Sequence, residues 1–240
     1  MSGQPPGEST NISRRVMLGM LGSGMAGIVL GSRVQDLLGR LPGPFGGSGD
    51  RFYSSLVPGR ARFRIYSVSD TFPDRSARDY RLDVTGLVAR PLRLSLDDLH
   101  SLPATRLERD FQCVTGWRVR DVPWAGLRVA ELLDRAGVRP EARAIRFRSF
   151  DGVYTESLTL EQARRPDVLV AYGMEGAPLS RAHGGPARLY VAPMYGYKSL
   201  KWLESIEVTD HVELGYWERQ DYDVDAWVGR SNTRPGDHPT

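Results

Sequence analysis

The chain has 240 residues, a formal net charge of +3 at pH 7 and a single cysteine, Cys113. This length allows one domain with a substantial core. Loss of residues 1–33 would remove three arginines and one glutamate and leave a net charge of +1. The net charge therefore points to neither nucleic acid nor an anionic membrane as a partner. One cysteine excludes an internal disulfide framework, so Cys113 is either a buried apolar filler or a functional thiol.

The N-terminal residues have the layout of a twin-arginine export signal. Arg14 and Arg15 precede an uncharged, glycine-rich apolar run at 16–31, and we expect residues 1–33 to be this signal. A short buried helix is the alternative, but the glycines are poor helix formers. The run is shorter than the ~20 residues of a comfortable membrane span, and no clean A-x-A site follows it. We therefore expect a periplasmic or otherwise extracytoplasmic protein whose signal is cut late or kept as an anchor.

The composition divides the rest of the chain into three parts. Residues 34–61 are rich in Gly and Pro and are expected to form a linker, and residues 229–240 are expected to be a disordered tail. The residues between them, 62–228, are expected to form a single domain.

Hydrophobic periodicity predicts short strands and isolated short helices. At 80–88, Tyr80, Leu82 and Val84 alternate with polar residues, as in a half-buried strand. Ser95 and Thr159 stand where N-caps are expected, and Gly137 where a C-cap is expected. The full pattern predicts helices at 95–102, 127–138 and 159–166 and strands at 80–88, 144–150, 168–172, 187–193 and 204–210.

These elements lack a regular βαβ rhythm. They favour a mixed α+β domain over a doubly wound parallel sheet. The sequence has no G-x-G-x-x-G after a strand and no G-x-x-x-x-G-K-[ST], which removes most support for a nicotinamide or nucleoside-triphosphate site.

Export of a folded protein is chiefly useful when a cofactor is inserted in the cytoplasm, so a cofactor is expected. The four histidines are widely scattered and no C-x-x-C or H-E-x-x-H occurs, so neither an all-protein zinc site nor a covalently attached haem is expected. A lone thiolate suits a soft or high-valent metal that arrives on an organic dithiolene.

Cations and glycines gather between residues 183 and 201. Here His183, Arg188, Lys198 and Lys201 alternate with glycines. Arginine offers a rigid fork to a phosphate, lysine offers a point charge, and glycine lets backbone N–H groups approach a ligand. The alternative is a strand at 187–193 that leads into a loop of solvated cations.

Five motifs, in order, resemble a known family. They read RDFQCVTGW, VPWAGLRVAELLDRAG, FRSFDGVYTESLTLEQA, HGGPARLYVAPMYGYKSLKWLESIEV and GYWERQDYDV. Together they resemble the molybdopterin-binding domain of the sulfite oxidase family, in particular bacterial members that lack a haem domain, such as the catalytic subunit of the periplasmic methionine-sulfoxide reductase. The resemblance extends from about Arg62 to Trp227 and implies a mixed-sheet α+β fold of the sulfite oxidase type.

The resemblance also implies the roles of particular residues. In the family, the cysteine of C-x-x-x-W is the single protein ligand to molybdenum, and Cys113 with Trp117 matches it. The remaining cofactor contacts, carried over motif by motif, are Ser67, Asp70, Thr71, Ser149, His183, Arg188, Lys198, Ser199 and Lys201. Arg188 inherits the cofactor phosphate. Ser67, Asp70 and Thr71 match the family pattern loosely.

The implied activity is transfer of an oxygen atom to or from a small sulfur-containing substrate, by sulfite-type oxidation or sulfoxide reduction. The molybdenum–molybdopterin cofactor supplies the reactive chemistry. Because the chain has no room for a haem domain, electrons are expected to pass to or from a separate electron-transfer protein, a haem protein or another, in solution or in the membrane. Tyr197, Arg118 and Lys198 are candidates near the substrate. Arg118 is alternatively a surface residue on an exposed strand.

Two other functions remain open from the residues alone. Cys113 and His183 are the pair expected of a thiol hydrolase or transpeptidase of the cell envelope. A secreted binding domain without a cofactor, in which Cys113 is core filler, is the third hypothesis.

Overall fold

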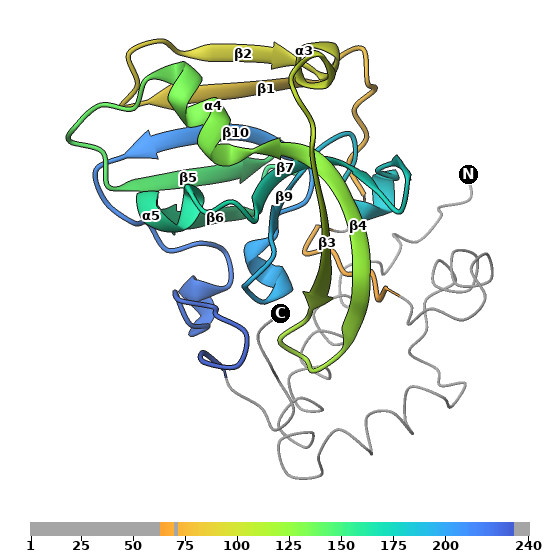
Figure 1. Ribbon diagram of the computed structural model, residues 1–240. Helices are drawn as coiled ribbons and strands as arrows, with labels where there is room; N and C mark the ends of the chain where they lie inside the picture. The colour runs from red at the N-terminus through yellow and green to blue at the C-terminus, as the bar shows by residue number, and fades with distance from the viewer. Residues whose placement is uncertain (1–62, 70–71, 233–240) are drawn as a thin grey trace, which may run out of the picture.

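The computed structural model describes residues 63–69 and 72–232 (Figure 1). The predicted signal at 1–33, the predicted linker at 34–61 and residues 233–240 of the predicted tail lie outside the described residues. Residues 228–230 form a turn and residues 231–232 a bend, where Asn232 donates from its backbone N–H to Asp223 Oδ2 at 2.8 Å. None of the helices described is long and apolar enough to cross a membrane.

The first sheet has the strand order β2-β1-β10-β5-β6. β1 pairs with β10 in parallel, whereas the other pairs are antiparallel. Inward-facing apolar residues alternate along these strands, as the sequence predicts, and Leu82 and Val84 of β1 are fully buried. The strands are β1 (Arg81–Gly86), β2 (Leu92–Ser95), β5 (Ala144–Ser149), β6 (Thr155–Thr159) and β10 (Leu203–Thr209).

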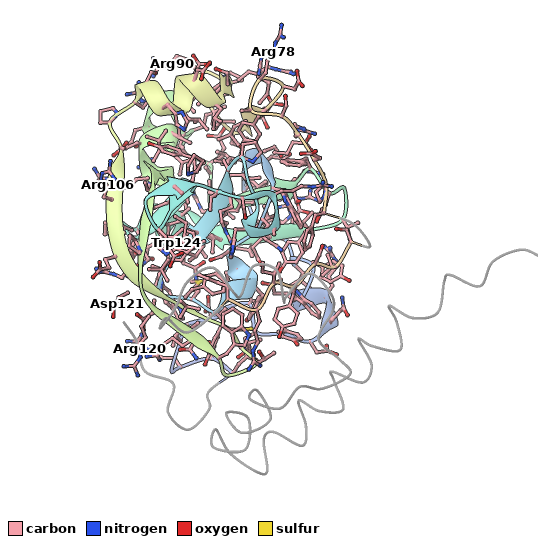
Figure 2. All side chains as sticks on the ribbon, turned by 90° about the vertical axis from the view of Figure 1, so that its right-hand side faces the viewer. Arg78, Arg90, Arg106, Arg120, Asp121 and Trp124 are labelled. Atoms are coloured by element: carbon pink, nitrogen blue, oxygen red, sulfur yellow. The ribbon has the colours of Figure 1, made fainter. Side chains whose placement is uncertain are left out.

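The second sheet is antiparallel and includes a long curved hairpin. Its order is β3-β4-β7-β8, and β9 also pairs with β7. The hairpin register shifts between Arg109 and Phe111, and Asp121 has a φ of 51°, which bends the ribbon. Figure 2 shows Trp124 inside this curve, with Arg106, Arg120 and Asp121 along its outer side. The strands are β3 (Thr105–Gln112), β4 (Arg118–Arg128), β7 (Val168–Met174), β8 (Ala177–Pro178) and β9 (Arg188–Val191).

The helices are short and begin where the sequence predicts. The Ser95 and Thr159 side chains form capping boxes with Asp98 and Gln162, and Gly137 ends a helix in the left-handed region at φ 70°. The third α-helix stops at Ala163, three residues before the predicted end at Pro166. The α-helices are α3 (Leu96–Ser101), α4 (Val129–Ala136) and α5 (Leu160–Ala163), and the 3-10 helices are η1 (Arg181–His183), η2 (Gly196–Lys198) and η3 (Glu218–Gln220).

The main core lies between the first sheet, α4 and strands β7 and β9. Val129, Leu132 and Leu133 of α4 are fully buried in it, and each contributes about 1.5–3 kcal/mol of transfer free energy. A smaller cluster covers the opposite face of the second sheet, where Trp124 stacks on Tyr190 with ring centroids 4.1 Å apart. The mixed α+β class predicted from the sequence is confirmed. The loops at 113–117, 181–188 and 195–201 carry most of the predicted site residues.

Candidate functional site

Cys113 lies in the tight turn that joins β3 to β4. Its N–H donates to the Trp117 carbonyl at 2.9 Å, and the Gly116 N–H donates to the Cys113 carbonyl at 3.0 Å. Gly116 has a φ of 98°, a conformation that favours glycine. The Thr115 hydroxyl lies 3.1 Å from Cys113 Sγ. The turn therefore holds a half-buried thiol in a defined position.

Aromatic rings connect this turn to the loop around His183. Trp117 stacks on Phe111 with centroids 5.7 Å apart, and Phe63 lies 6.3 Å from Trp117 and 5.0 Å from the His183 ring. The indole Nε1 of Trp117 is buried and has no hydrogen-bond partner among the described residues. A buried donor without a partner is unusual in a folded protein and indicates a ligand or solvent acceptor.

Arg188 is a buried cation held by carbonyl groups. It begins β9, is 4% exposed, and donates to the carbonyls of His183 at 3.0 Å, Ser199 at 2.6 Å and Leu189 at 3.3 Å. Within the described residues no carboxylate forms an ion pair with it. Burial lowers the pKa of Arg188 to about 10. Because a buried charge normally has a counterion, this arrangement suits an anionic ligand.

Lys201 adds a second cation to the same loop. Its Nζ donates to the Tyr66 carbonyl at 2.6 Å and the Ala182 carbonyl at 3.3 Å. Burial, reinforced by repulsion from Arg188, lowers the pKa of Lys201 to about 7. Gly184 has a φ of 94°, and a Cβ there would lie 2.8 Å from Lys201 Cβ. Gly184 is therefore needed because any side chain at this position would clash with Lys201.

His183 completes the group. Burial lowers the pKa of His183 to about 4, and the charges of Arg188 and Lys201 act in the same direction. The imidazole is consequently neutral at pH 7. An anion placed among His183, Arg188 and Lys201 would raise all three lowered pKa values, since it would favour the protonated forms.

Each of the predicted serines, Ser67, Ser149 and Ser199, has a hydroxyl group that already makes one hydrogen bond. Ser149 and Ser199 are buried, and their Oγ atoms accept from the N–H groups of Asp151 at 3.1 Å and Val191 at 3.0 Å. Ser67 is exposed, 2.8 Å from Ser69 Oγ, and follows the residue whose carbonyl binds Lys201. The predicted residues Asp70 and Thr71 lie outside the described residues.

The predicted substrate residues Tyr197 and Arg118 make different contacts. The Tyr197 hydroxyl donates to the Asp223 carbonyl at 2.8 Å, and burial raises its pKa. Arg118 spans the hairpin to hydrogen-bond Gln112 and lies 3.4 Å from Asp110 Oδ2. With a side chain only 18% exposed, Arg118 is not the solvated surface residue of the alternative interpretation.

Lys198 does not lie where the sequence interpretation puts it. The side chain is 1% exposed, and its ammonium group donates to Glu156 at 2.5 Å, Glu218 at 2.6 Å and the Ser157 carbonyl at 2.9 Å. These contacts use all three N–H donors, so the geometry contradicts a contact from this ammonium group to cofactor or substrate. Its carboxylate partners, Glu156 and Glu218, lie within two of the motifs quoted above, but nothing in those motifs assigns them a role.

A groove of about 820 Å³ lies between β3, β4 and β7 and the segment at 74–77, and Arg181, Gly185 and Pro186 of the loop around His183 also line it. Arg106, His100 and Tyr172 are among its lining residues, and none of the predicted site residues lines it. Sequence reasoning also did not anticipate Phe63 or the Tyr66 carbonyl, because the contacts of this N-terminal segment are formed only in the folded chain.

The donors gathered here fit a phosphate-bearing, nitrogen- and oxygen-rich cofactor. Arg188 and Lys201 provide positive charge, and the Trp117 indole offers an unused donor beside the cysteine turn. No cluster of three or more His, Cys, Asp or Glu side chains suited to a metal ion occurs in the described part of the chain.

The sequence matches the family model for the oxidoreductase molybdopterin binding domain over residues 69–217. An uncharacterized oxidoreductase, YuiH, of Bacillus subtilis is 36% identical over 156 residues, covering 64% of this chain and 78% of the relative. The methionine-sulfoxide reductase catalytic subunit MsrP of Gluconobacter oxydans is 29% identical over 251 residues, covering 95% and 79%.

A plant sulfite oxidase, from Arabidopsis thaliana, is 33% identical, but the match covers 60% of this chain and only 46% of that longer relative. Among solved structures, the sulfane dehydrogenase SoxCD of Paracoccus pantotrophus is similar with a TM-score of 0.54 and 26% identity, covering 58% of this chain and 40% of the other. The expected family resemblance and the sulfite-oxidase-type fold are thereby confirmed.

Proposed function

Because this chain belongs to the family of oxidoreductase molybdopterin-binding domains, we propose that it is an exported enzyme that transfers an oxygen atom to or from a small sulfur-containing substrate. Membership of the family makes it an oxidoreductase that binds a molybdopterin cofactor. The substrate class, the direction of transfer and the export route are our proposal.

One observation carries the proposal. Arg188 is a buried cation and Lys201 a half-buried one, and both are bound to carbonyl groups. The Arg188 guanidinium lies over the Phe111 ring of the aromatic cluster beside the Cys113 turn, and the Lys201 ammonium lies over the Trp202 ring. We assign the cofactor phosphate to Arg188 and Lys201, the pterin surroundings to His183, Ser149, Ser199 and the segment after Ser67, and the metal to Cys113. When bound, this cofactor supplies a molybdenum centre that exchanges an oxygen atom with the substrate and electrons with a partner.

The chain's own residues have simpler tasks. The Cys113 turn orients the thiolate, and Arg188 neutralises negative charge on the cofactor. Arg118 and Tyr197 are proposed to lie near the substrate. A separate electron-transfer protein, haem-containing or otherwise, is proposed to complete turnover, and residues 1–33 are proposed to direct export by the twin-arginine route.

A thiol hydrolase is not favoured. A pKa of about 4 makes His183 a weak general base at neutral pH. That function would also leave the buried cations unexplained.

The test uses the full chain purified with its cofactor from a molybdenum-sufficient host. Sulfoxide reduction is assayed with a reduced dye as electron donor, and sulfite oxidation with an oxidised dye as acceptor. We expect one of the two reactions in the wild-type protein and neither in Cys113→Ala. A molybdenum-loaded wild-type protein that catalyses neither reaction would overturn the substrate class.

A further inference from the structure

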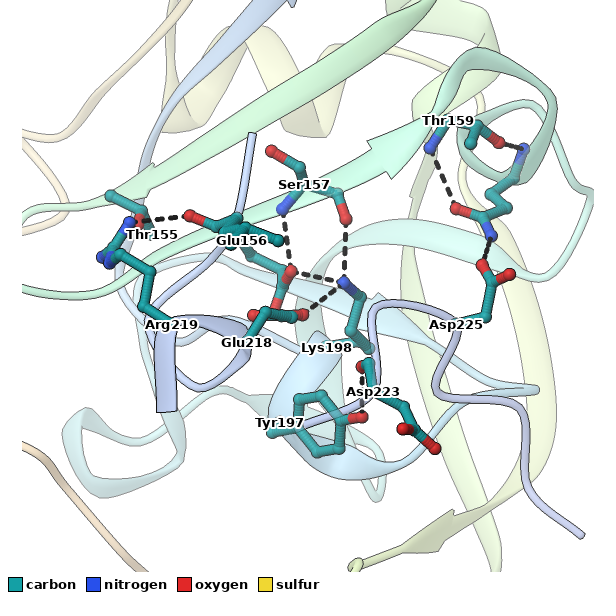
Figure 3. Close-up of polar contacts among 12 residues, drawn as sticks. Thr155, Glu156, Ser157, Thr159, Tyr197, Lys198, Glu218, Arg219, Asp223 and Asp225 are labelled. Carbon is teal, nitrogen blue, oxygen red and sulfur yellow. Dashed lines mark hydrogen bonds and ion pairs between the residues drawn. The ribbon is translucent and has the colours of Figure 1, made fainter. Parts of the chain in front are cut away.

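Three buried side chains form the Lys198 cluster, which consists of Lys198, Glu156 and Glu218 (Figure 3). The side chains of all three are at most 1% exposed. Lys198 Nζ lies between Glu156 Oε1 and Glu218 Oε1, and Glu156 Oε1 also accepts from the Ser157 N–H at 2.8 Å. The second oxygens, Glu156 Oε2 and Glu218 Oε2, are buried and have no hydrogen-bond partner among the described residues.

The cluster contains one charge too many if every group is ionised. Two carboxylates and one ammonium leave one net negative charge, and burial of an uncompensated charge is costly. One proton shared by the two carboxyl groups removes that net charge. It also converts one of the unpartnered oxygens into a hydroxyl group. Burial and repulsion from Glu218 raise the pKa of Glu156 to about 8 despite the attraction of Lys198. Burial lowers the pKa of Lys198, but its attraction to the two carboxylates outweighs burial, so the net shift is upward.

A glycine makes room for the two carboxyl groups. A Cβ at Gly215 would lie 2.4 Å from Glu218 Oε2 and 2.8 Å from Glu156 Oε1. Both carboxyl groups therefore face the same small space, which a larger residue would fill.

The Lys198 cluster joins three segments of the chain next to residues 199–201. Glu156 comes from β6, Lys198 from η2 and Glu218 from η3. The segment that contains η2 continues to Ser199, whose carbonyl accepts from Arg188, and to Lys201.

The other side of η2 faces the cysteine hairpin. A Cβ at Gly196 would lie 2.5 Å from the Phe111 ring and 3.4 Å from the Gln112 carbonyl oxygen, immediately before Cys113. Any displacement of η2 therefore moves residues 199–201 relative to the Cys113 thiol.

We propose that Lys198 is a positioning residue, which fixes residues 195–201 against the Cys113 hairpin, and that Glu156 and Glu218 together hold one extra proton that keeps the Lys198 cluster neutral. This inference rests on the proposed function, because its effect is on retention of the cofactor.

Other polar groups lie close to the Lys198 cluster. The Tyr154 hydroxyl donates to the Tyr197 carbonyl at 2.7 Å, and burial raises the pKa values of both tyrosines. Arg219 donates to the Leu214 carbonyl and Thr155 Oγ1. Asp223 accepts from the Asn232 N–H. Within the Lys198 cluster, the raised pKa of Glu156, about 8, places a protonation step of a carboxyl group near neutral pH.

Charge counting gives the test, with molybdenum and pterin per chain as the readout. Glu218→Gln leaves one carboxylate and one ammonium, so its cofactor content at pH 7 should stay within about twofold of wild type. Glu156→Gln/Glu218→Gln leaves an unpaired ammonium, so its content should fall by about tenfold or more. Adding Lys198→Met to this double variant restores neutrality and should recover much of the loss. A single glutamine variant as defective as the double, or a double variant with wild-type content, overturns the proposal.

A pH series decides the matter if the double variant is insoluble. Loaded proteins are incubated between pH 6 and 9, filtered and analysed for retained pterin. Wild type should lose more pterin above about pH 8, where the second carboxyl ionises. Glu218→Gln should lack this step. Curves of retained pterin against pH that run parallel in the two proteins overturn the proposal. Asp134→Asn, which removes an exposed ion pair with Arg164, is the control and should match wild type. Absence of molybdenum and pterin from the wild-type protein would instead contradict the proposed function.

Discussion

At the scale of single residues, Arg188 and Lys201 raise one question: why does the protein bury these cations without an ion pair among the described residues? Both side chains are held by backbone carbonyls, and burial lowers the pKa of each. Carbonyl dipoles compensate part of the desolvation cost, but a full negative charge compensates more. The cofactor phosphate is the group that resolves this imbalance in our account.

Replacement of Arg188 by alanine should lower molybdenum and pterin content together. A bidentate, charge-assisted contact is worth about 1.5–3 kcal/mol, or roughly one to two decades of affinity. Arg188→Lys should recover only part, because a point charge does not reproduce the guanidinium fork. Arg118→Ala is the comparison and should keep full cofactor content while the Michaelis constant changes. Full content with poor substrate binding in Arg188→Ala would move this residue to the substrate pocket.

Lys201 should make the stability of the cofactor-free protein depend on pH. Its pKa falls from the usual 10.5 to about 7 in the folded state, so above pH 7 the unfolded chain binds more protons. The free energy of unfolding should therefore rise with pH toward 10. Measurements above pH 8 avoid Glu156, whose raised pKa acts in the opposite sense below that value. Denaturant titrations should show a smaller rise in Lys201→Met; equal slopes in the two proteins would contradict the assignment.

At the scale of elements, the packing of η2 against the β3–β4 hairpin connects the two halves of the site. Gly196 permits this contact because a Cβ would lie 2.5 Å from the Phe111 ring. The Ser199 carbonyl and Lys201 follow on the same segment, and Cys113 follows Phe111 on the hairpin. This close contact therefore helps to set the distance between the proposed metal ligand and the proposed phosphate anchors.

Gly196→Ala should separate these two elements and lower both cofactor content and turnover, while the protein still folds. Gly173→Ala is a suitable control, since its new Cβ would meet nothing closer than 3.3 Å. Molybdenum analysis and circular dichroism of both variants give the comparison. Wild-type occupancy in Gly196→Ala would show that this contact does not position the site.

Local signals predict some elements well and others poorly, for physical reasons. Ser95, Thr159 and Gly137 act within a few residues of themselves, so their caps can be read directly from the sequence. The long strands β3 and β4 are not among the strands predicted from periodicity, because charged residues cover one side of them and a proline, Pro123, stands inside β4.

The same distinction applies to the site. The motifs around Cys113, His183, Arg188 and Lys201 predict residues that the fold brings to neighbouring loops. Lys198 belongs to the same motif, yet its side chain binds Glu156 and Glu218, which lie 42 and 20 residues away in sequence. A long-range ion pair of this kind leaves no local pattern.

At the scale of the whole molecule, the described residues form two mixed or antiparallel sheets with short helices, and the Cys113 turn lies at the tip of the long β3–β4 hairpin (Figure 1). The family relationship covers 69–217, which contains every predicted site residue except Ser67. The N-terminal residues 1–62 lie outside the described part, and their role is tested in cells rather than by geometry.

Changing Arg14 and Arg15 together to lysine should leave the protein in the cytoplasm, because the twin-arginine pathway reads the pair. The protein should still carry its cofactor, since loading precedes export in this account. Fractionation followed by molybdenum analysis measures both. Normal arrival of the double variant in the cell envelope would show that another route is used.

The central claim is that Cys113 is the protein's ligand to the molybdenum of its cofactor. X-ray absorption at the molybdenum edge, on wild-type and Cys113→Ser proteins purified from the same host, tests it most directly. We expect the variant to remain folded and keep its pterin, to lose one sulfur atom from the metal's coordination shell and to lose turnover. The same sulfur coordination in both proteins, with activity retained in Cys113→Ser, would contradict the claim.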